Sequence, residues 1–301
     1  MKLTPESKVL VQGIKEPLGA IHAALMKEYG TNVVAGISPG EGGQELNGIP
    51  IFDLVEQAIA VVGAIDISVI FVKAYSAVDA ALEAIAAGIR QIVIVSQGIP
   101  PLDMVRLIRK AESTETSIVG PNSPGIIIPG KLLVGTHLSQ VYTPGRVGII
   151  SRCSTLTSEV ALQLTQAGIG QSISVGIGSD AIVGSSFVQW LQILDEDDNT
   201  EAIVLIGETG GSSEELAAHY IAETIDKPVI AYIAGRYAPK EKPLSHGSAI
   251  IGFFSAELGT KTGTTESKIA AFESAKIKIA PRPSAIPEMV QKVLKPPKKK
   301  K

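Results

Sequence analysis

The chain has 301 residues, of which 45% are hydrophobic and 19% are charged, and its formal net charge is −3. This balance is typical of a folded protein of about two domains and lacks the basic character of a general nucleic-acid binder. The single cysteine cannot form a disulfide within the chain, and no apolar run reaches the roughly 18 residues of a membrane-spanning helix. We therefore expect no nucleic-acid and no membrane partner, and a reducing, cytoplasmic location.

The first part of the chain repeats one rhythm, in which a β-branched run is followed by a turn and an Ala-rich amphipathic stretch. Only 4% of the residues are aromatic, so the core must be built from Ala, Val, Ile and Leu. Buried strands that alternate with helices predict a doubly wound α/β domain around a parallel sheet. The predicted strands cover 8–11, 32–37, 66–72 and 91–96, and the predicted helices cover 18–29, 52–62, 77–87 and 101–112.

The composition changes in the middle of the chain, where prolines and glycines are frequent. Two short apolar segments there, 126–128 and 132–134, predict a small hairpin. The α/β rhythm then resumes. The strands are predicted at 147–150, 172–175, 202–206 and 229–233, and the helices at 155–167, 185–194, 213–224, 265–274 and 284–294. We expect a first domain at 1–125, a crossing segment at 126–145, a second domain at 146–294 and a disordered basic tail at 295–301.

The first predicted strand ends in a glycine turn that leads into a helix. Gly13 lets the chain turn, Gly19 lets the helix approach the sheet, and Pro17 suits the first helical position. The N–H groups at that helix start would face a phosphate. The dinucleotide fingerprint is incomplete, because Lys15 takes a glycine position and the second strand ends in Ile37-Ser38-Pro39-Gly40, with no acidic residue placed for a ribose. A nucleotide-like site without NAD and a plain tight turn are both compatible with this pattern.

A second loop, at 36–40, matches the pattern G-x-S-x-G of a nucleophile elbow around Ser38. An elbow serine is followed directly by a helix. Here Glu41 and two glycines follow, and they are poor helix formers. The segment is therefore interpreted as an ordinary loop that faces a ligand.

Three features of the second half carry candidate chemistry. Cys153, Ser154 and Thr155 open a helix directly after a strand, where N–H groups can hold an anion. Cys153 itself is interpreted as packing at the turn, with an activated thiolate as the alternative. Glu208 lies between glycines at a strand end, so it reaches into a cleft or closes a turn. His246 lies on a loop of small residues and is a candidate base or nucleophile. The four histidines show no metal-ligand spacing, so no metal site is expected.

Together these motifs resemble the family of succinyl-CoA synthetase (succinate–CoA ligase) alpha subunits along nearly the whole chain, up to Leu294. Each motif is weak alone, whereas their joint order and spacing are specific. The motifs that carry the resemblance are the turn at Gly13, Gly-Ile-Ser-Pro-Gly at 36–40, Gly-Ile-Pro at 98–100, Gly-Pro-Asn-Ser-Pro-Gly at 120–125, the segment 151–157, Gly-Glu-Thr-Gly-Gly at 207–211 and Ser-His-Gly at 245–247.

The resemblance implies a Rossmann-like CoA-binding domain followed by a flavodoxin-like ligase domain, in one subunit of a heteromer. It implies that ATP or GTP, bound with Mg2+ mainly by a partner beta subunit, phosphorylates His246. The phosphoryl group then passes to succinate, and CoA displaces phosphate. Glu208 would orient His246, and the helix start at Cys153, Ser154 and Thr155 would stabilise the phosphoryl charge. The implied CoA-binding residues are Gly13, Gly19, Ser38, Pro39, Ser96, Gln97 and Asn122.

The chain departs from the family pattern at ligand positions. Glu16 lies at the CoA helix start and Glu41 replaces a usual lysine, while Cys153 and Ser154 replace a Ser-Gly pair and Ser158 replaces a tyrosine. Three hypotheses therefore stay open. The chain is a subunit of succinate–CoA ligase, a subunit of a related acyl-CoA ligase for another carboxylic acid, or a non-catalytic binding protein that kept the scaffold.

Overall fold

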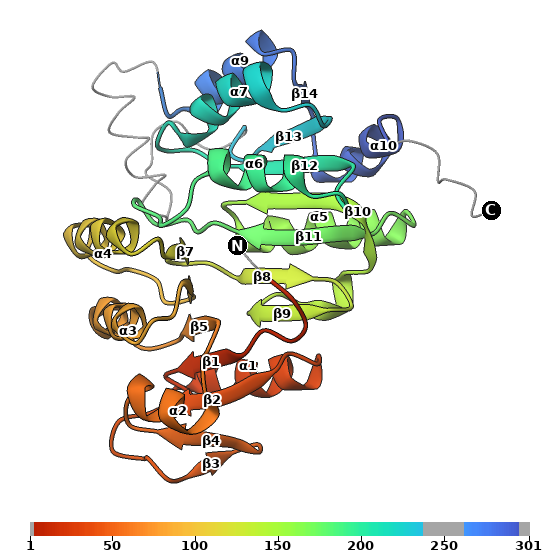
Figure 1. The fold of residues 1–301 in the computed structure, drawn as a ribbon. Helices are drawn as coiled ribbons and strands as arrows, with labels where there is room; N and C mark the ends of the chain where they lie inside the picture. Colours follow the sequence, from red (N-terminus) through yellow and green to blue (C-terminus); the bar gives the residue numbers. More distant parts are fainter. Residues whose placement is uncertain (1–2, 237–261, 295–301) are drawn as a thin grey trace. The chain divides into compact units, whose positions relative to one another are not determined.

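A computed structural model describes residues 3–236 and 262–294 and divides into two compact units (Figure 1). Unit 1 comprises Met1–Ser139 and Val175–Ser185, and unit 2 comprises Gln140–Ser174 and Ser186–Lys301. Among the helices of the described residues, none has the length and the apolar character needed to cross a membrane.

Unit 1 is built around a sheet with the strand order β3-β4-β2-β1-β5-β6-β7. Neighbouring strands are parallel, except for the antiparallel pair β3 and β4. The strands are β1 (Val9–Gln12), β2 (Val33–Ile37), β3 (Glu45–Leu46), β4 (Ile49–Phe52), β5 (Ile67–Ile70), β6 (Gln91–Ile94) and β7 (Ser117–Val119). The helices are α1 (Pro17–Glu28), α2 (Val55–Val62), α3 (Ala74–Ala86) and α4 (Pro101–Ser113). The predicted doubly wound α/β domain is confirmed.

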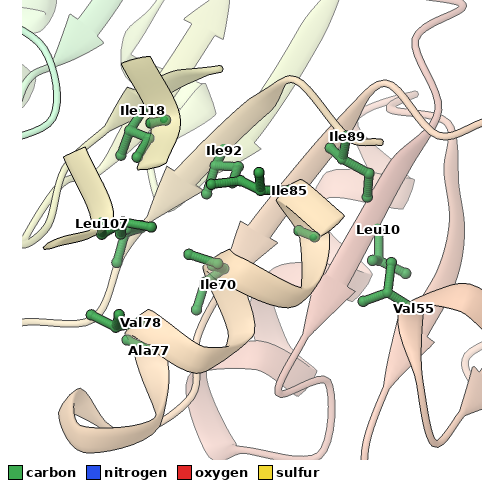
Figure 2. Packing of buried hydrophobic residues seen from close by; sticks show 14 of the residues in the cluster. Leu10, Val55, Ile70, Ala77, Val78, Ile85, Ile89, Ile92, Leu107 and Ile118 are labelled. Atoms are coloured by element: carbon green, nitrogen blue, oxygen red, sulfur yellow. The ribbon is translucent and has the colours of Figure 1, made fainter. Parts of the chain in front are cut away.

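The core of unit 1 consists of aliphatic side chains between the sheet and its helices. Figure 2 shows Ala77, Val78 and Ile85 of α3 beside Ile70 and Ile92 of the sheet. All five side chains are at most 9% exposed. Small residues on the buried face of α3 let the helix lie close to the strands, which explains why this core needs few aromatic residues.

The order of the strands fixes where a ligand can bind. The chain leaves β1 for β2 on one side and later returns to β5 on the other side, so β1 lies between them. In open α/β sheets the crevice forms at such a reversal, outside the carboxyl ends of the strands. In unit 1 these ends carry the Gly13 turn and the segment that follows Ile70.

The predicted small hairpin is confirmed as β8 (Gly125–Ile128) and β9 (Leu132–Gly135), which pair antiparallel. It is attached to the end of α1. The Thr31 hydroxyl donates to the carbonyl of Leu133 at 2.7 Å and accepts from the Leu133 N–H at 3.0 Å. The Gly130 N–H donates to the Tyr29 hydroxyl at 2.7 Å.

Unit 2 repeats the α/β pattern with the strand order β14-β13-β12-β10-β11. The pairs β10/β12, β12/β13 and β13/β14 are parallel. The strands are β10 (Pro144–Ser151), β11 (Gln171–Gly176), β12 (Ala202–Gly207), β13 (Val229–Ile233) and β14 (Lys278–Ile279). The helices are α5 (Ser154–Gln166), α6 (Phe187–Glu196), α7 (Ser213–Thr224), α9 (Thr265–Ser274) and α10 (Ile286–Gln291). Two 3-10 turns are also present, η1 (Ser139–Val141) and η2 (Pro283–Ala285). The last predicted helix is shorter than expected, because η2 precedes α10.

The buried histidine of unit 1 gives a testable pH dependence. Burial lowers the pKa of His137 to about 4, although its Nε2 lies 3.0 Å from the Gly125 carbonyl. The unfolded imidazole binds a proton at a higher pH than the native one, so stability is present above about pH 6.5 and is lost as pH falls through about 4. In the wild type, the free energy of unfolding should be lower at pH 4.5 than at pH 7 by on the order of 3 kcal/mol because of this group. We expect His137→Gln to reduce this difference, measured by urea unfolding at the two pH values.

The matched control is His219→Gln, because the His219 side chain is 72% exposed. This variant should keep the wild-type difference between the two pH values. If the free energy of unfolding of His137→Gln differed between the two pH values as much as that of the wild type, another group would cause the acid sensitivity.

Candidate functional site

The glycine turn after β1 has the geometry of a close approach between backbone segments. Gly13 has φ +79°, and a Cβ there would lie 2.9 Å from the backbone nitrogen of Val72. A Cβ at Gly19 would lie 3.0 Å from the carbonyl carbon of Gly13 and still closer to its oxygen. Both glycines are therefore required sterically, as predicted, because α1 begins directly against the turn.

Lys15, just before the start of α1, contacts polar residues of the loop that follows β2. Glu16 is the N-cap residue without a side-chain cap hydrogen bond, and Pro17 opens the helix. The Lys15 Nζ lies 3.2 Å from Glu41 Oε2 and donates to Gln44 Oε1 at 3.0 Å. The lysine in the turn thus pairs with the acid that departs from the family pattern at position 41, rather than with Glu16.

The loop after β2 is folded around one carboxylate. The N–H groups of Gly40 and Gly42 both donate to Asp53 Oδ1, at 2.7 and 3.0 Å. Ser38 follows the end of β2, and its hydroxyl lies 3.5 Å from Glu41 Oε2. No helix follows Ser38 directly, so the interpretation as a loop rather than a nucleophile elbow is confirmed.

A pocket of about 350 Å³ lies at the carboxyl ends of the unit 1 strands. The Ser96 hydroxyl donates to the Val72 carbonyl and ties two of its walls together. The predicted CoA residues Ser96 and Gln97 therefore lie at the crevice that the strand order creates. The lining residues are Leu18, Phe71, Val72, Lys73, Ala74, Val95, Ser96 and Gln97.

Asn122 is connected to the same strand ends. Its backbone N–H donates to the Ser96 carbonyl at 2.8 Å, and its Nδ2 donates to Asp180 Oδ1 at 3.0 Å. Asp180 Oδ2 also accepts from the Gly98 N–H at 2.9 Å. Asp180 is a residue that the sequence analysis did not single out, because it is 58 residues from Asn122 and 82 from Gly98.

In unit 2, the start of α5 follows β10 directly, as predicted. Cys153 is the N-cap residue, and its N–H donates to the Ser151 hydroxyl at 3.0 Å. The side chains of Ser154 and Thr155 are exposed in the first turn. A helix start of this kind offers N–H groups and a positive dipole end to an anion.

The Cys153 thiol is not activated. Burial raises its pKa above the ordinary value, the N–H groups of Leu156 and Thr155 lower it in part, and the charge of Glu208 raises it further. The thiol is therefore protonated at neutral pH. The raised pKa favours the predicted packing of Cys153 at the turn over the alternative of an activated thiolate.

Glu208 follows β12 and is 8% exposed. Its carboxylate lies 3.9 Å from Arg152 Nη2, and its N–H donates to Glu214 Oε1 at 3.1 Å. Arg152 Nη1 in turn lies 3.1 Å from Glu214 Oε1 and donates to the Gly210 carbonyl at 3.0 Å. The backbone and the side chain of Glu208 are thus both held by one buried ionic network.

Lys268 of α9 completes this network. It is fully buried, forms an ion pair with Glu214 and donates to the Gly211 carbonyl at 2.8 Å. Its Nζ also lies 3.0 Å from Glu215 Oε2, and Glu215 accepts from the Gly263 N–H at 2.9 Å. The network holds the glycine loop 207–211 through contacts to Glu208, Gly210 and Gly211. Of its members, only Glu208 was predicted from the sequence as a candidate site residue.

His246 lies in 237–261, outside the described residues, and so does the predicted basic tail at 295–301. Within the described residues, no cluster of His, Cys, Asp and Glu has the geometry to hold a metal ion. What unit 2 presents is an anchored acid, Glu208, and a helix start at Cys153 in the same ionic neighbourhood.

Comparisons with known proteins match both parts of the chain. The model of the CoA binding domain matches residues 4–98, and that of the CoA-ligase domain matches residues 150–280. The ADP-forming succinate–CoA ligase subunit alpha 2 of Archaeoglobus fulgidus is 44% identical over 288 residues, which cover 96% of this chain and 97% of that protein. The corresponding alpha subunit of Aquifex aeolicus is 45% identical over 292 residues, which cover 96% and 93%.

Solved structures share the fold at low sequence identity. A mutant ATP citrate lyase of Methanosaeta concilii in complex with (3S)-citryl-CoA matches with a TM-score of 0.86 and 21% identity over 97% of this chain and 50% of that chain. The ATP citrate lyase of Methanothrix soehngenii in complex with citrate and coenzyme A matches with a TM-score of 0.85 and 20% sequence identity, and the match covers 100% of this chain and 53% of that chain. The chain thus spans about half the length of these structures.

The curated relatives match over nearly the whole of both chains, and the two domain models follow the order of the two α/β units. The chain belongs to the family of succinate–CoA ligase alpha subunits.

Proposed function

We propose that this chain is the alpha subunit of a succinate–CoA ligase, which forms succinyl-CoA from succinate, CoA and a nucleoside triphosphate. The observation that carries the proposal is the identity of 44% and 45% to ADP-forming alpha subunits over 96% of the chain. The alternatives, a ligase for another acid and a non-catalytic protein, are not favoured by these relatives. A cytoplasmic location remains part of the proposal.

CoA binds to unit 1 in this proposal. The supporting features are the steric fit of Gly13 and Gly19 at the start of α1 and the pocket beside Ser96 and Gln97. Ser38, Pro39 and Asn122 complete the proposed set. The loop with Ser38 is rigid because Asp53 fixes its amides, so it can serve as a wall for a ligand.

The chemistry of unit 2 proceeds through His246 in the proposal. An imidazole nitrogen attacks the γ-phosphorus of ATP or GTP, which the partner beta subunit holds with Mg2+, and the nucleoside diphosphate leaves. Glu208 accepts the N–H of the other ring nitrogen and so keeps the attacking nitrogen unprotonated. The helix start at Cys153, Ser154 and Thr155 stabilises the phosphoryl charge. Succinate then takes the phosphoryl group, and the CoA thiol displaces phosphate from the acyl phosphate.

Labelling of His246 tests this function. The chain, co-expressed with a candidate beta subunit, should take up the γ-phosphoryl group of ATP or GTP as an acid-labile, base-stable phosphate. His246→Ala should abolish the label, and Glu208→Gln should slow its formation by about 10²-fold or more. His219→Ala is the matched control and should label like the wild type, because His219 is an exposed residue of α7.

The discharge of the label identifies the acid. Succinate and CoA together should remove the phosphate from His246 and yield succinyl-CoA. Discharge only by another carboxylic acid would replace succinate in the proposal, and equal labelling of wild type and His246→Ala would refute the phosphohistidine.

A further inference from the structure

Asp180 joins two segments of unit 1 that are distant in sequence. Its Oδ2 accepts from the Gly98 N–H at 2.9 Å, after β6, and its Oδ1 accepts from Asn122 Nδ2 at 3.0 Å, after β7. One carboxylate therefore bridges the segments that follow two neighbouring strands, β6 and β7.

Each of the two segments contains a residue with a left-handed backbone. Gly98 has φ +76°, and Asn122, which is not a glycine, has φ +55°. The Asn122 N–H donates to the Ser96 carbonyl at 2.8 Å, and Ser96 lines the pocket. Two hydrogen bonds thus connect Asp180 through Asn122 to Ser96 at the pocket wall.

The bond to Asp180 also decides which end of the Asn122 amide is available to a ligand. A carboxylate only accepts hydrogen bonds, so it takes the Nδ2 donor and leaves Oδ1 as the acceptor. The pantetheine arm of CoA carries amide N–H donors, whereas its phosphates carry acceptors only. An oriented Oδ1 is therefore complementary to the pantetheine arm.

We propose that Asp180 is a positioning residue that fixes the Asn122 amide so that its carbonyl oxygen accepts a hydrogen bond from the pantetheine arm of CoA. This inference rests on the proposed CoA-binding function of unit 1. It adds a specificity determinant that is contributed by the segment Val175–Ser185.

Asp180→Asn tests the inference in the full chain by calorimetric titration. The two donors bond to different oxygens of Asp180, and the new amide has an oxygen at only one of these positions, so the Asn122 amide loses its fixed orientation. The dissociation constant for CoA should rise about tenfold. That for 3′-phosphoadenosine 5′-diphosphate, the nucleotide half of CoA, should stay unchanged, as should the thermal midpoint within a few degrees.

Two further variants keep the test decisive. Asp66→Asn is the matched control, because Asp66 Oδ2 accepts from the Lys8 N–H at 2.8 Å at the amino end of β5, and it should bind CoA like the wild type. Asn122→Ala should weaken CoA binding as Asp180→Asn does, and the double variant should be no weaker than either single one.

Unchanged CoA affinity in Asp180→Asn, or an equal loss for CoA and its nucleotide half, would overturn the positioning role alone. A wild-type chain that binds neither ligand would overturn the CoA site of the proposed function and the inference with it.

Discussion

Replacing Glu214 with alanine should lower the free energy of unfolding by about 3–5 kcal/mol. Glu214 is fully buried and pairs with two cations, Arg152 at 3.1 Å and the fully buried Lys268. Its removal leaves these charges buried, and the carboxylates that remain beside them among the described residues are Glu208 at 3.9 Å from Arg152 and Glu215 at 3.0 Å from Lys268. The measurement is urea unfolding at pH 7.

The matched control is Glu201→Ala, which removes a well-formed but more exposed ion pair of unit 2. Arg146 and Glu201 are 2.6 Å apart, but their side chains are 35% and 34% exposed, so water compensates the loss. We expect a cost of about 0–1 kcal/mol. Equal costs for the two variants would show that burial does not set the energy of the Glu214 network.

A second variant separates charge from volume. Glu214→Gln keeps the shape and one acceptor for the Glu208 N–H, which lies 3.1 Å from Oε1, but it loses the charge. Since the cost arises from the buried cations Arg152 and Lys268 losing the carboxylate that they share, Gln should be nearly as destabilising as Ala. A glutamine variant as stable as the wild type would assign the effect to packing.

The α/β architecture could be predicted because its signals are local. Runs such as 8–11 and 202–206 are apolar throughout, as in strands covered on both faces, and they alternate with amphipathic helices. β3 and β4 were missed because both are short and Pro50 interrupts the second. β14 was missed because it contains only Lys278 and Ile279.

The ionic network could not be predicted, because it depends on contacts between distant residues. Arg152 and Glu214 are 62 residues apart, and Lys268 and Glu214 are 54 apart. Nothing in the local pattern of α9 distinguishes Lys268 from a solvated lysine. A buried charge becomes recognisable only when its partners are placed, whereas Glu208 was recognised from its position between glycines at a strand end.

The same contrast applies to the departures from the family pattern. Read as single changes, Lys15 in the glycine turn and Glu41 in the following loop each alter the charge near the CoA site. The structure shows that they are 3.2 Å apart and form an ion pair. The charges of the two changed residues thus offset each other locally.

Replacing Gly19 with alanine should abolish most CoA binding, although helix propensity alone favours alanine by about 1 kcal/mol. A Cβ at this position would lie 3.0 Å from the Gly13 carbonyl carbon and closer still to its oxygen, and backbone cannot move aside as a side chain does. α1 must therefore shift away from the turn, at a cost of about 1–3 kcal/mol in unfolding free energy. Its N–H groups then no longer face the phosphate position, so the dissociation constant for CoA should rise by about tenfold or more.

Gly30→Ala, just beyond the other end of α1, is the control that separates this contact from glycine replacement as such. Gly30 has φ +99°, and nothing lies within 4 Å of an added Cβ, so only the backbone strain of about 1–2 kcal/mol applies. Both variants then lose comparable stability in urea unfolding, whereas only Gly19→Ala loses CoA binding in calorimetry. Because the two variants have similar stabilities, a difference in their CoA affinity is caused by the displaced start of α1 and not by a general loss of stability. Equal affinities would show that CoA binding does not depend on the close contact between α1 and the Gly13 turn.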